Sequence, residues 1–381
     1  MSVDSIYFSP DVEAFRTRTR RFLRGHVTPH LQEWESQRRI PRDIWRLFAE
    51  EGLLGLHYPR AYGGRELSFF HSVAYLEELG RLGNGGFRGA MSVHSYMATT
   101  YLQMAGDHCQ KLKYLKPAVQ GEMIAALAIT EPQAGSDVSG IRCAARTQGD
   151  RYVIRGSKAF VTNGLNADFL VAAVRTGDGE GPGGISLFVV DARAPGVTRT
   201  PVEKLGWHCS DTASVEFDDV VVEADQLLGR KNAGFLLIMK AFQLERIAAA
   251  LLAIGETDCA LELARTYANE RRVFGSAITG HQVVRHRLAE LMSHTEAARQ
   301  LAYHAAWLHS QGKLAMSQCA MAKLRATELA VEAAGQCLQL FGGHGYLAEA
   351  PIAQLFRDTR LVTIAGGTSE IMREIIAESE L

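Results

Sequence analysis

The spacing of hydrophobic residues changes twice along the chain, and this change constrains the fold most strongly. Up to about residue 122, apolar residues recur at helical spacing. From residue 123 to about 230, short runs of β-branched and aromatic residues alternate with turns, and helical spacing then returns until residue 381. We therefore predict an α+β protein with an N-terminal helical domain (1–122), a middle β domain (123–230) and a C-terminal helical domain (231–381).

Local signals refine this outline. Ser9 and Pro10 predict the start of the first helix, because Ser favours the N-cap and Pro the first helical position. Glycines in residues 62–64 and 83–86 predict loops between helices, and the glycine-rich residues 176–184 predict an exposed, mobile loop between strands. Four clear strands are predicted in the β domain, at residues 152–155, 169–174, 185–190 and 213–222.

Composition argues against several classes of function. The 41 Lys and Arg residues nearly balance the 42 Asp and Glu residues, so we expect no nucleic-acid-binding surface. The six cysteines form no C-x-x-C pair, and we expect neither a metal site nor a disulfide framework. No apolar run reaches the roughly 20 residues of a membrane-spanning helix. The first 30 residues, which are partly acidic, do not resemble a targeting peptide, so we expect a cytoplasmic protein without membrane insertion.

A dinucleotide-binding Rossmann domain is not predicted either. The glycine-rich stretch at residues 342–345 reads GGHG, which does not match the G-x-G-x-x-G pattern and does not follow a strand. Any dinucleotide cofactor must therefore be held by a different architecture.

Residues 127–138 read LAITEPQAGSDV. They resemble the flavin-contacting signature T-E-P-x-A-G-S-D of the acyl-CoA dehydrogenase family. In isolation such a stretch would be a simple turn with polar caps, but the match is long. The resemblance implies that Leu127, Ile129, Thr130 and Ser136 contact the cofactor, and that Ser136 also lies beside the thioester of the substrate.

Further segments are similar to the same family. Residues 156–164, GSKAFVTNG, resemble the strand that places an aromatic ring and a threonine against the flavin, which implies these roles for Phe160 and Thr162. Phe160 stands where the family often has Trp, and both residues offer a flat apolar face. Residues 270–275, ERRVFG, resemble a motif that serves the FAD of a neighbouring subunit. This implies cofactor contacts from Arg271, whose guanidinium suits phosphate oxygens, and from Phe274 and Gln282.

Two C-terminal segments complete the resemblance, QLFGGHGY at residues 339–346 and IAGGTSEI at residues 364–371. They imply cofactor contacts from Gln339, Gly342, Gly343, Thr368 and Glu370. The resemblance covers the whole chain and implies the acyl-CoA dehydrogenase fold, with a β-barrel-like middle domain and a C-terminal four-helix bundle. Because Arg271 and Gln339 would serve a neighbour's FAD, it also implies a homodimer or, as is usual in the family, a homotetramer.

The commonest catalytic base of the family is missing here. Many members carry it in the sequence Y-E-G-T, whereas this chain has Gly366 at that position. The branch that includes long-chain and isovaleryl-CoA dehydrogenases places its Glu in an L-x-x-E-R pattern on another helix. Phe242 to Arg246 resemble that pattern, which implies Glu245 as the base and Arg246 as a residue that shapes the substrate pocket.

Helix geometry supports Glu245 independently. It interrupts an apolar stripe formed by Ile238, Phe242, Ala249 and Leu252, so its carboxyl should face inward. A buried carboxyl without a counter-charge should have a raised pKa, as a base needs. The alternative is a structural ion pair.

The activity implied is the FAD-dependent α,β-dehydrogenation of an acyl thioester on CoA or on a carrier protein. Glu245 would take the α-proton while the β-hydride passes to flavin N5, and the Gly366 N–H would polarise the thioester carbonyl. Electron-transfer flavoprotein is the expected acceptor. An acyl-CoA oxidase or flavin monooxygenase on the same fold, and a non-catalytic binding protein, are alternatives. The sequence leaves open the acyl chain, and whether the enzyme serves fatty acid or secondary metabolism.

Overall fold

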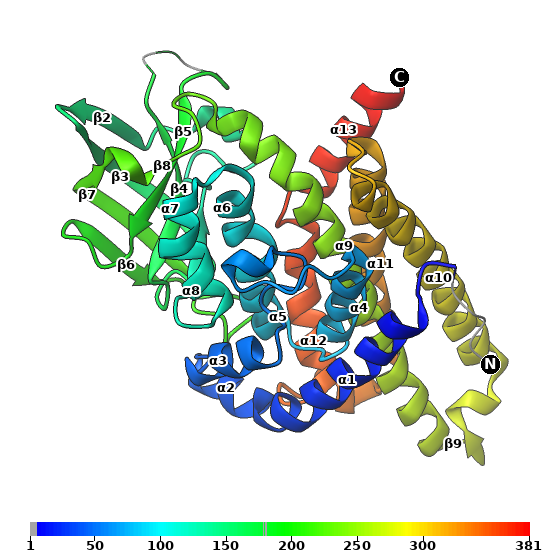
Figure 1. The fold of residues 1–381 in the computed structure, drawn as a ribbon. Helices are drawn as coiled ribbons and strands as arrows, with labels where there is room; N and C mark the ends of the chain where they lie inside the picture. Colours follow the sequence, from blue (N-terminus) through cyan, green and yellow to red (C-terminus); the bar gives the residue numbers. More distant parts are fainter. Residues whose placement is uncertain (1–5, 178, 180) are drawn as a thin grey trace.

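The computed structural model describes residues 6–381 except 178 and 180, and it confirms the order of helices, sheet and helices (Figure 1). The N-terminal part is mainly helical. Two short π-helical segments, η3 and η4, interrupt it, and its elements are α1 (Pro10–His26), α2 (Leu31–Gln37), α3 (Asp43–Glu50), α4 (Phe69–Gly80), α5 (Gly85–Ser92), η3 (Val93–Ala98), α6 (Thr99–Ala105), α7 (His108–Gln110), η4 (Lys111–Leu115) and α8 (Lys116–Val119).

The middle part is one sheet in the spatial order β6-β7-β3-β2-β4-β5-β8, with β1 paired in parallel to β4. The other pairings are antiparallel except the short one between β2 and β4. The strands are β1 (Ala125–Ala128), β2 (Ala144–Gln148), β3 (Arg151–Val161), β4 (Phe169–Arg175), β5 (Ile185–Asp191), β6 (Val197–Pro201), β7 (Ala213–Glu223) and β8 (Leu227–Leu228).

Long helices form the C-terminal part. Helix α9 runs from the sheet to the opposite end of the molecule, where the hairpin of β9 and β10 connects it to α10 (Figure 1). Helix α11 packs against α9, α10, α12 and α13. These elements are α9 (Gly234–Glu270), β9 (Arg272–Val273), β10 (Ser276–Ala277), α10 (Gln282–Ser310), α11 (Met316–Leu340), α12 (Pro351–Thr359) and α13 (Ser369–Glu380).

The strands predicted from β-branched runs are confirmed, and β1, β2, β6 and β8 are additional. Strand β1 reads AALA and has no β-branched residue, while β6 reads VTRTP and is largely exposed at the sheet edge. Neither has the alternation that identifies a half-buried strand. The predicted loop at 176–184 connects β4 to β5, and its residues 178 and 180 lie outside the described part of the chain.

Two details of the helical prediction need correction. Helix α1 begins at Pro10 as predicted, but the Ser9 hydroxyl bonds to Asp11 and does not cap the helix. Gly85 and Gly86 belong to α5 and not to a loop. A Cβ on Gly85 would lie 2.2 Å from the Trp207 indole nitrogen, so the glycine permits close packing inside a helix.

Close packing also fixes α9 against α4. A Cβ on Gly80 of α4 would lie 2.2 Å from the Leu252 carbonyl oxygen, and one on Gly255 of α9 would lie 2.3 Å from the Glu77 carbonyl oxygen. The two backbones therefore touch where both helices carry glycine. This contact sets the depth of α9 in the molecule and thereby the position of Glu245.

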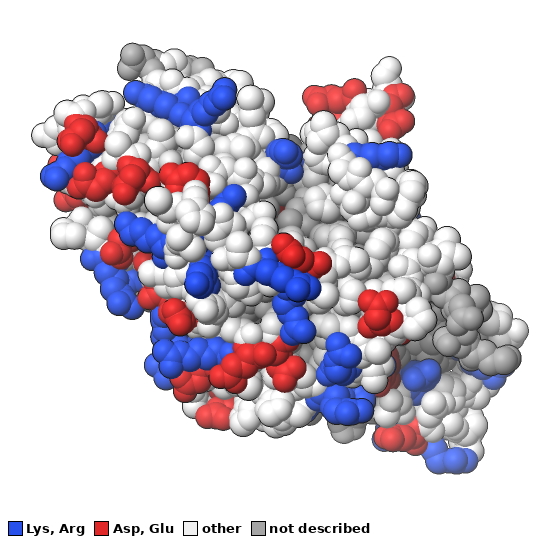
Figure 2. All heavy atoms as spheres, viewed as in Figure 1, with Lys and Arg blue, Asp and Glu red and all other residues white. Residues whose placement is uncertain are grey.

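On the face drawn in Figure 2, basic and acidic side chains are interspersed over the helical and sheet parts. Within the described part of the chain, no helix combines the length and the apolar composition needed to cross a bilayer.

Candidate active site

Glu245 lies inside the molecule, with only 4% of its surface exposed. The predicted inward orientation is confirmed, but the apolar stripe is not the reason for it. All residues from Gln243 to Ala248 are buried, because α9 is surrounded by α4, α6, α10 and α11. The position of Glu245 in the middle of a central helix buries its carboxyl, whichever face of the helix it occupies.

The carboxyl of Glu245 has a neutral hydrogen-bond donor as its partner. The hydroxyl of Tyr101, on α6, donates to Oε1 of Glu245 over 3.3 Å. Burial raises the pKa of Glu245 to about 7, against the opposing effects of the Tyr101 hydrogen bond and the nearby Arg246 charge. Within the described residues Glu245 forms no ion pair, so the structural ion pair considered from the sequence is not observed.

Arg246 is buried as well, with 3% of its surface exposed. Its guanidinium lies 5.7 Å from the centre of the Phe242 ring, and its Nε and Nη1 atoms have no hydrogen-bond partner among the described residues. Burial lowers the pKa of this guanidinium. Two nitrogen atoms without hydrogen-bond partners on a buried cation are costly, which indicates a site that a polar ligand completes.

The Gly366–Gly367 turn lies between α12 and α13. Lys323, which feels the charge of Arg246, connects the turn to the surroundings of Arg246. Both glycines have left-handed φ angles, +67° and +93°. In the described part of the chain neither of their N–H groups donates a hydrogen bond, so both can bind a ligand. The ammonium of Lys323, on α11, donates to the Gly367 carbonyl oxygen over 2.6 Å.

The segments predicted to contact the isoalloxazine ring come together at the sheet. The Ala159 N–H donates to the Thr130 carbonyl oxygen over 2.8 Å, which ties the segment after β1 to the end of β3. Leu127 and Thr130 are half-buried, Ile129 is buried, Thr162 is half-buried, and Ser136 is exposed in the turn that follows.

Phe160 is 67% exposed, although its neighbours Ala159 and Val161 are buried. The pairing of β3 with β7 shifts by one residue between Lys158 and Val161, and Phe160 takes a left-handed φ of 55°. This β-bulge turns an aromatic ring out of the sheet, as bulges beside functional sites commonly do. The exposed flat ring fits the aromatic contact that a flavin requires.

A buried ion pair supports the same segments. The Lys158 ammonium lies 2.6 Å from the Glu131 carboxylate and donates to the Ile129 carbonyl oxygen over 3.0 Å. The carboxylate also accepts from the amides of Arg142 and Cys143. Burial alone would raise the pKa of Glu131, but Lys158 and these amides hold it below its usual value.

The remaining predicted residues are not brought to the sheet. Arg271, Phe274 and Gln282 are exposed at the end of the molecule marked by β9 in Figure 1, and the sheet lies at the opposite end. The Tyr267 ring stacks on Phe341 at 4.2 Å between centres, so the end of α11 lies beside the end of α9. The predicted cofactor residues thus form two groups, one at the sheet and one at this far end. The exposed residues Gln339, Gly342 and Gly343 belong to the group at the far end, together with Arg271.

Thr368 and Glu370 lie at the start of α13. The Thr368 hydroxyl accepts from the Ile371 N–H over 3.3 Å and caps the helix, and Glu370 is exposed. Gln282, at the start of α10, lines an open pocket of about 740 Å³ between α10 and α11.

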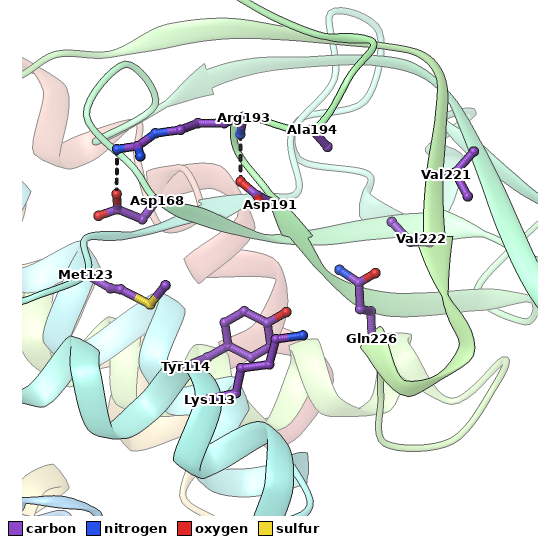
Figure 3. A pocket seen from close by; sticks show the side chains of 10 residues that line it. All are labelled: Lys113, Tyr114, Met123, Asp168, Asp191, Arg193, Ala194, Val221, Val222 and Gln226. Atoms are coloured by element: carbon purple, nitrogen blue, oxygen red, sulfur yellow. Dashed lines mark hydrogen bonds and ion pairs between the residues drawn. The ribbon is translucent and has the colours of Figure 1, made fainter.

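Another pocket, of about 390 Å³, lies between η4 and the sheet (Figure 3). Several of its polar groups pair with one another: the Arg193 side chain binds Asp168, and its backbone N–H binds Asp191. None of the predicted site residues lines this pocket. It therefore does not belong to the candidate active site.

The sequence did not identify Tyr101 or Lys323. Tyr101 is 144 positions from Glu245 and belongs to no recognisable motif. Lys323 left one signal that could have been used, because it is the only charged residue within the run of small and apolar residues from Cys319 to Leu324 on a helix. Such a lysine is expected to face the interior.

The chain matches three family models along its length. These are the N-terminal domain of acyl-CoA dehydrogenases over residues 9–122, the middle domain over residues 126–220 and the C-terminal domain over residues 232–381. Among curated proteins, the mitochondrial long-chain specific acyl-CoA dehydrogenase of Mus musculus is 36% identical, and the match covers 97% of this chain and 86% of the relative.

Solved structures agree with these matches. A probable acyl-CoA dehydrogenase from Mycobacterium abscessus is 39% identical, with a TM-score of 0.95 over 98% of this chain and 99% of the other. The FAD complex of PigA is 28% identical, with a TM-score of 0.94 over 100% of this chain and 99% of the other. The predicted fold, with helical N- and C-terminal domains around a middle sheet domain, is confirmed.

Proposed function

Since this chain belongs to the acyl-CoA dehydrogenase family, we propose that it oxidises the Cα–Cβ bond of an acyl thioester with FAD as its cofactor and Glu245 as its base. The observation that carries this proposal is the environment of Glu245. A buried carboxyl with a pKa of about 7 and no ion-pair partner among the described residues suits a base that works near neutral pH.

Glu245 acts on the α-proton of the thioester. That proton is too weakly acidic for a carboxylate unless the carbonyl oxygen is polarised at the same time. The free N–H of Gly366 supplies a hydrogen bond to this oxygen, which strengthens as enolate character develops. The Tyr101 hydroxyl orients the carboxyl and stabilises its ionised form. FAD, when bound, accepts the hydride from the β-carbon.

The residues fit this cofactor. Phe160 offers an exposed flat ring on a rigid bulge beside Thr130 and Thr162. At the other end, the backbone of Gly342 and Gly343 is open to close approach, since a Cβ on either glycine would meet no atom within 4 Å. Arg271 adds a charge that suits a pyrophosphate. FAD is also the molecule bound in the related structure of PigA.

The distance between these two groups supports a site made from two chains. The sheet carries one group and the far end of α9 carries the other (Figure 1). The ring of Phe274 at that far end is 98% exposed, although a large apolar side chain is normally covered. A homodimer, or a tetramer of such dimers, would bring the two groups to one FAD.

The experiment is an anaerobic titration of the purified flavoprotein with acyl thioesters of different chain length and branching, on CoA and on carrier protein. At least one thioester should bleach the visible flavin band and yield the α,β-unsaturated product. Bound flavin that no thioester reduces would contradict the proposal, and absence of flavin would favour a binding protein.

Reoxidation of the reduced enzyme after this titration distinguishes a dehydrogenase from an oxidase. Electron-transfer flavoprotein is the proposed acceptor, and it should reoxidise the substrate-reduced enzyme faster than air does. Rapid reoxidation by air with release of hydrogen peroxide would identify an oxidase instead.

A further inference from the structure

Lys323 is an unusual residue for the interior of a helical bundle. It has no measurable exposure, and within the described residues it forms no ion pair with a carboxylate. Its ammonium makes one hydrogen bond, to the Gly367 carbonyl oxygen at 2.6 Å. An unbranched apolar side chain would fill similar space without bringing a charge out of water.

The electrostatic surroundings make this position still less favourable for a lysine. Burial, and then the positive charge of Arg246, lowers the pKa of Lys323 to about 8. The other charged groups that act on it are Glu328, on α11 itself, and Glu370, on α13. Stability alone therefore does not explain why a lysine occupies this position. Its hydrogen bond to the Gly367 carbonyl oxygen does.

That contact holds a turn that has few other supports. Gly366 and Gly367 both adopt left-handed φ angles, and their N–H groups donate no hydrogen bond within the part of the chain that the structure describes. On one side, the turn is anchored by the Ala365 N–H, which donates to the Leu361 carbonyl oxygen. On the other side, Thr368 caps α13. Between these anchors, Lys323 provides the only hydrogen bond to the two glycines in the described part of the chain.

We infer that Lys323 is a positioning residue: by holding the Gly367 carbonyl oxygen, it fixes the Gly366–Gly367 turn so that the Gly366 N–H points at the thioester carbonyl. The inference rests on the proposed function, in which this N–H polarises the substrate. Glycine at position 366 makes such an anchor necessary, because a residue without a Cβ leaves the backbone free to reorient.

The anchor matters for the rate more than for binding. A hydrogen bond to the developing enolate oxygen acts only when the donor is correctly placed, and a small displacement costs as much as about 100-fold in rate. Such a hydrogen bond stabilises the transition state more than the bound substrate. Loss of the anchor should therefore lower kcat while KM changes little.

Two variants separate positioning from packing. Lys323→Met keeps an unbranched side chain that is one atom shorter and removes the donor, and Lys323→Arg restores a cationic donor. Thr327→Val is the matched control, because Thr327 is buried one turn later on α11 and, among the described residues, its hydroxyl bonds to the backbone carbonyl oxygens of Lys323 and Leu324 and not to the Lys323 side chain. Flavin content and thermal unfolding establish that each variant is folded.

Two further measurements report on the turn and on the first chemical step. Hydrogen–deuterium exchange of a peptide covering residues 364–372 reports on the turn without any substrate. Exchange of the α-proton with D₂O, for a thioester whose β-carbon carries no hydrogen, reports on enolate formation alone. In that reaction the α-proton passes to the Glu245 carboxylate, the carbonyl oxygen takes up the electron pair, and a deuteron returns to the carbon.

Lys323→Met should exchange faster at residues 364–372 and lose about 10- to 100-fold in both kcat and α-proton exchange, with KM within about threefold of wild type. Lys323→Arg should recover most of the loss. In wild type kcat should also decline above about pH 8, because the neutral amine of Lys323 donates a weaker hydrogen bond than the ammonium, and this decline should move to higher pH in Lys323→Arg.

Equal kcat in wild type and Lys323→Met, or equal losses in Lys323→Met and Thr327→Val, would overturn the inference and leave the proposed function intact. If wild type itself neither exchanges the α-proton nor reduces its flavin with any thioester, the proposed function fails instead.

Discussion

At the scale of single residues, the environment of Glu245 makes its carboxylate more basic and also makes the ionised form unfavourable in the folded protein. An ionised carboxylate in the interior needs compensation, and the described structure offers only the Tyr101 hydroxyl and the charge of Arg246. Natural proteins tolerate such a residue where its chemistry is required. The free-energy cost of ionising Glu245 and its reactivity as a base therefore have one cause, which is burial without an ion-pair partner among the described residues.

This cost should appear in the pH dependence of stability. Because folding raises the pKa of Glu245 from 4.5 to about 7, the folded protein retains this proton between these pH values while the unfolded chain loses it. The stability contributed by the protonated group is complete below about pH 4.5 and is lost as the pH rises to about 7.

Glu245→Gln should therefore match wild type near pH 4.5 and be more stable by up to about 3 kcal/mol at pH 8. Denaturant unfolding at both pH values measures this difference. An equal difference at the two pH values would show that Glu245 does not titrate in this range.

The hydroxyl of Tyr101 should tune the base. It stabilises the carboxylate form of Glu245, so its removal in Tyr101→Phe should raise the pKa of Glu245 further, by about one unit for a hydrogen bond to a charged group. The rise of the flavin reduction rate with pH should then occur at higher pH. Stopped-flow reduction across pH 5 to 9 measures it, and an unchanged profile would mean that the contact has no role in catalysis.

Single residues also show which parts of the candidate site could be predicted from the sequence. Glu245 was predicted because a motif and a helical position agreed. Tyr101 and Lys323 act through contacts between helices distant in sequence, and no local pattern encodes such contacts. The turn at Gly366 was predicted to offer an N–H, but the lysine that holds it was not.

At the scale of elements, β3 shows how a strand supports both a fold and a site. Its run of aromatic and β-branched residues at 152–155 predicted the strand, but that run does not indicate which way Phe160 faces. The bulge near Lys158 instead turns the ring outward. A bulge depends on pairing with β7, more than 50 residues later, so the sequence of β3 could not reveal it.

The Glu131–Lys158 pair should hold this element in place. Glu131→Gln would leave the Lys158 ammonium buried without a counter-charge, and we expect a loss of about 3–5 kcal/mol and of flavin occupancy. Thermal unfolding and the flavin-to-protein ratio measure both. Glu122→Gln, at an exposed position, is the control.

Combining Glu131→Gln with Lys158→Met should recover part of this stability, because no buried charge then remains unpaired. If Glu131→Gln alone were as stable as the Glu122→Gln control, the Glu131–Lys158 pair would not support the strand.

At the scale of the whole molecule, the order of helical and sheet segments was predictable, because each segment carries its own periodicity. Their spatial arrangement was not, since the contact of α9 with α4 depends on glycines 175 positions apart, at Gly80 and Gly255. The separation of the two groups of cofactor residues agrees with the expectation that another chain completes the site.

Mixed oligomers test this arrangement. Glu245→Gln chains should be inactive, and Arg271→Gln chains should lose most of their FAD. In a dimer of one chain of each kind, one site combines Glu245 from one chain with Arg271 from the other, and about half of the wild-type activity should return. Pairing Arg271→Gln chains with chains that carry both substitutions is the control. If mixed dimers stay inactive, each site is complete within one chain.

The central claim is that Glu245 removes the α-proton, and the most direct measurement is the rate of anaerobic flavin reduction in a single turnover. With a thioester that reduces wild type, Glu245→Gln should bind the substrate but reduce its flavin about 10²- to 10⁴-fold more slowly. Glu262→Gln, which removes an exposed carboxyl from the same helix, should behave as wild type. Reduction of the Glu245→Gln enzyme at the wild-type rate would contradict the account and assign the base to another residue.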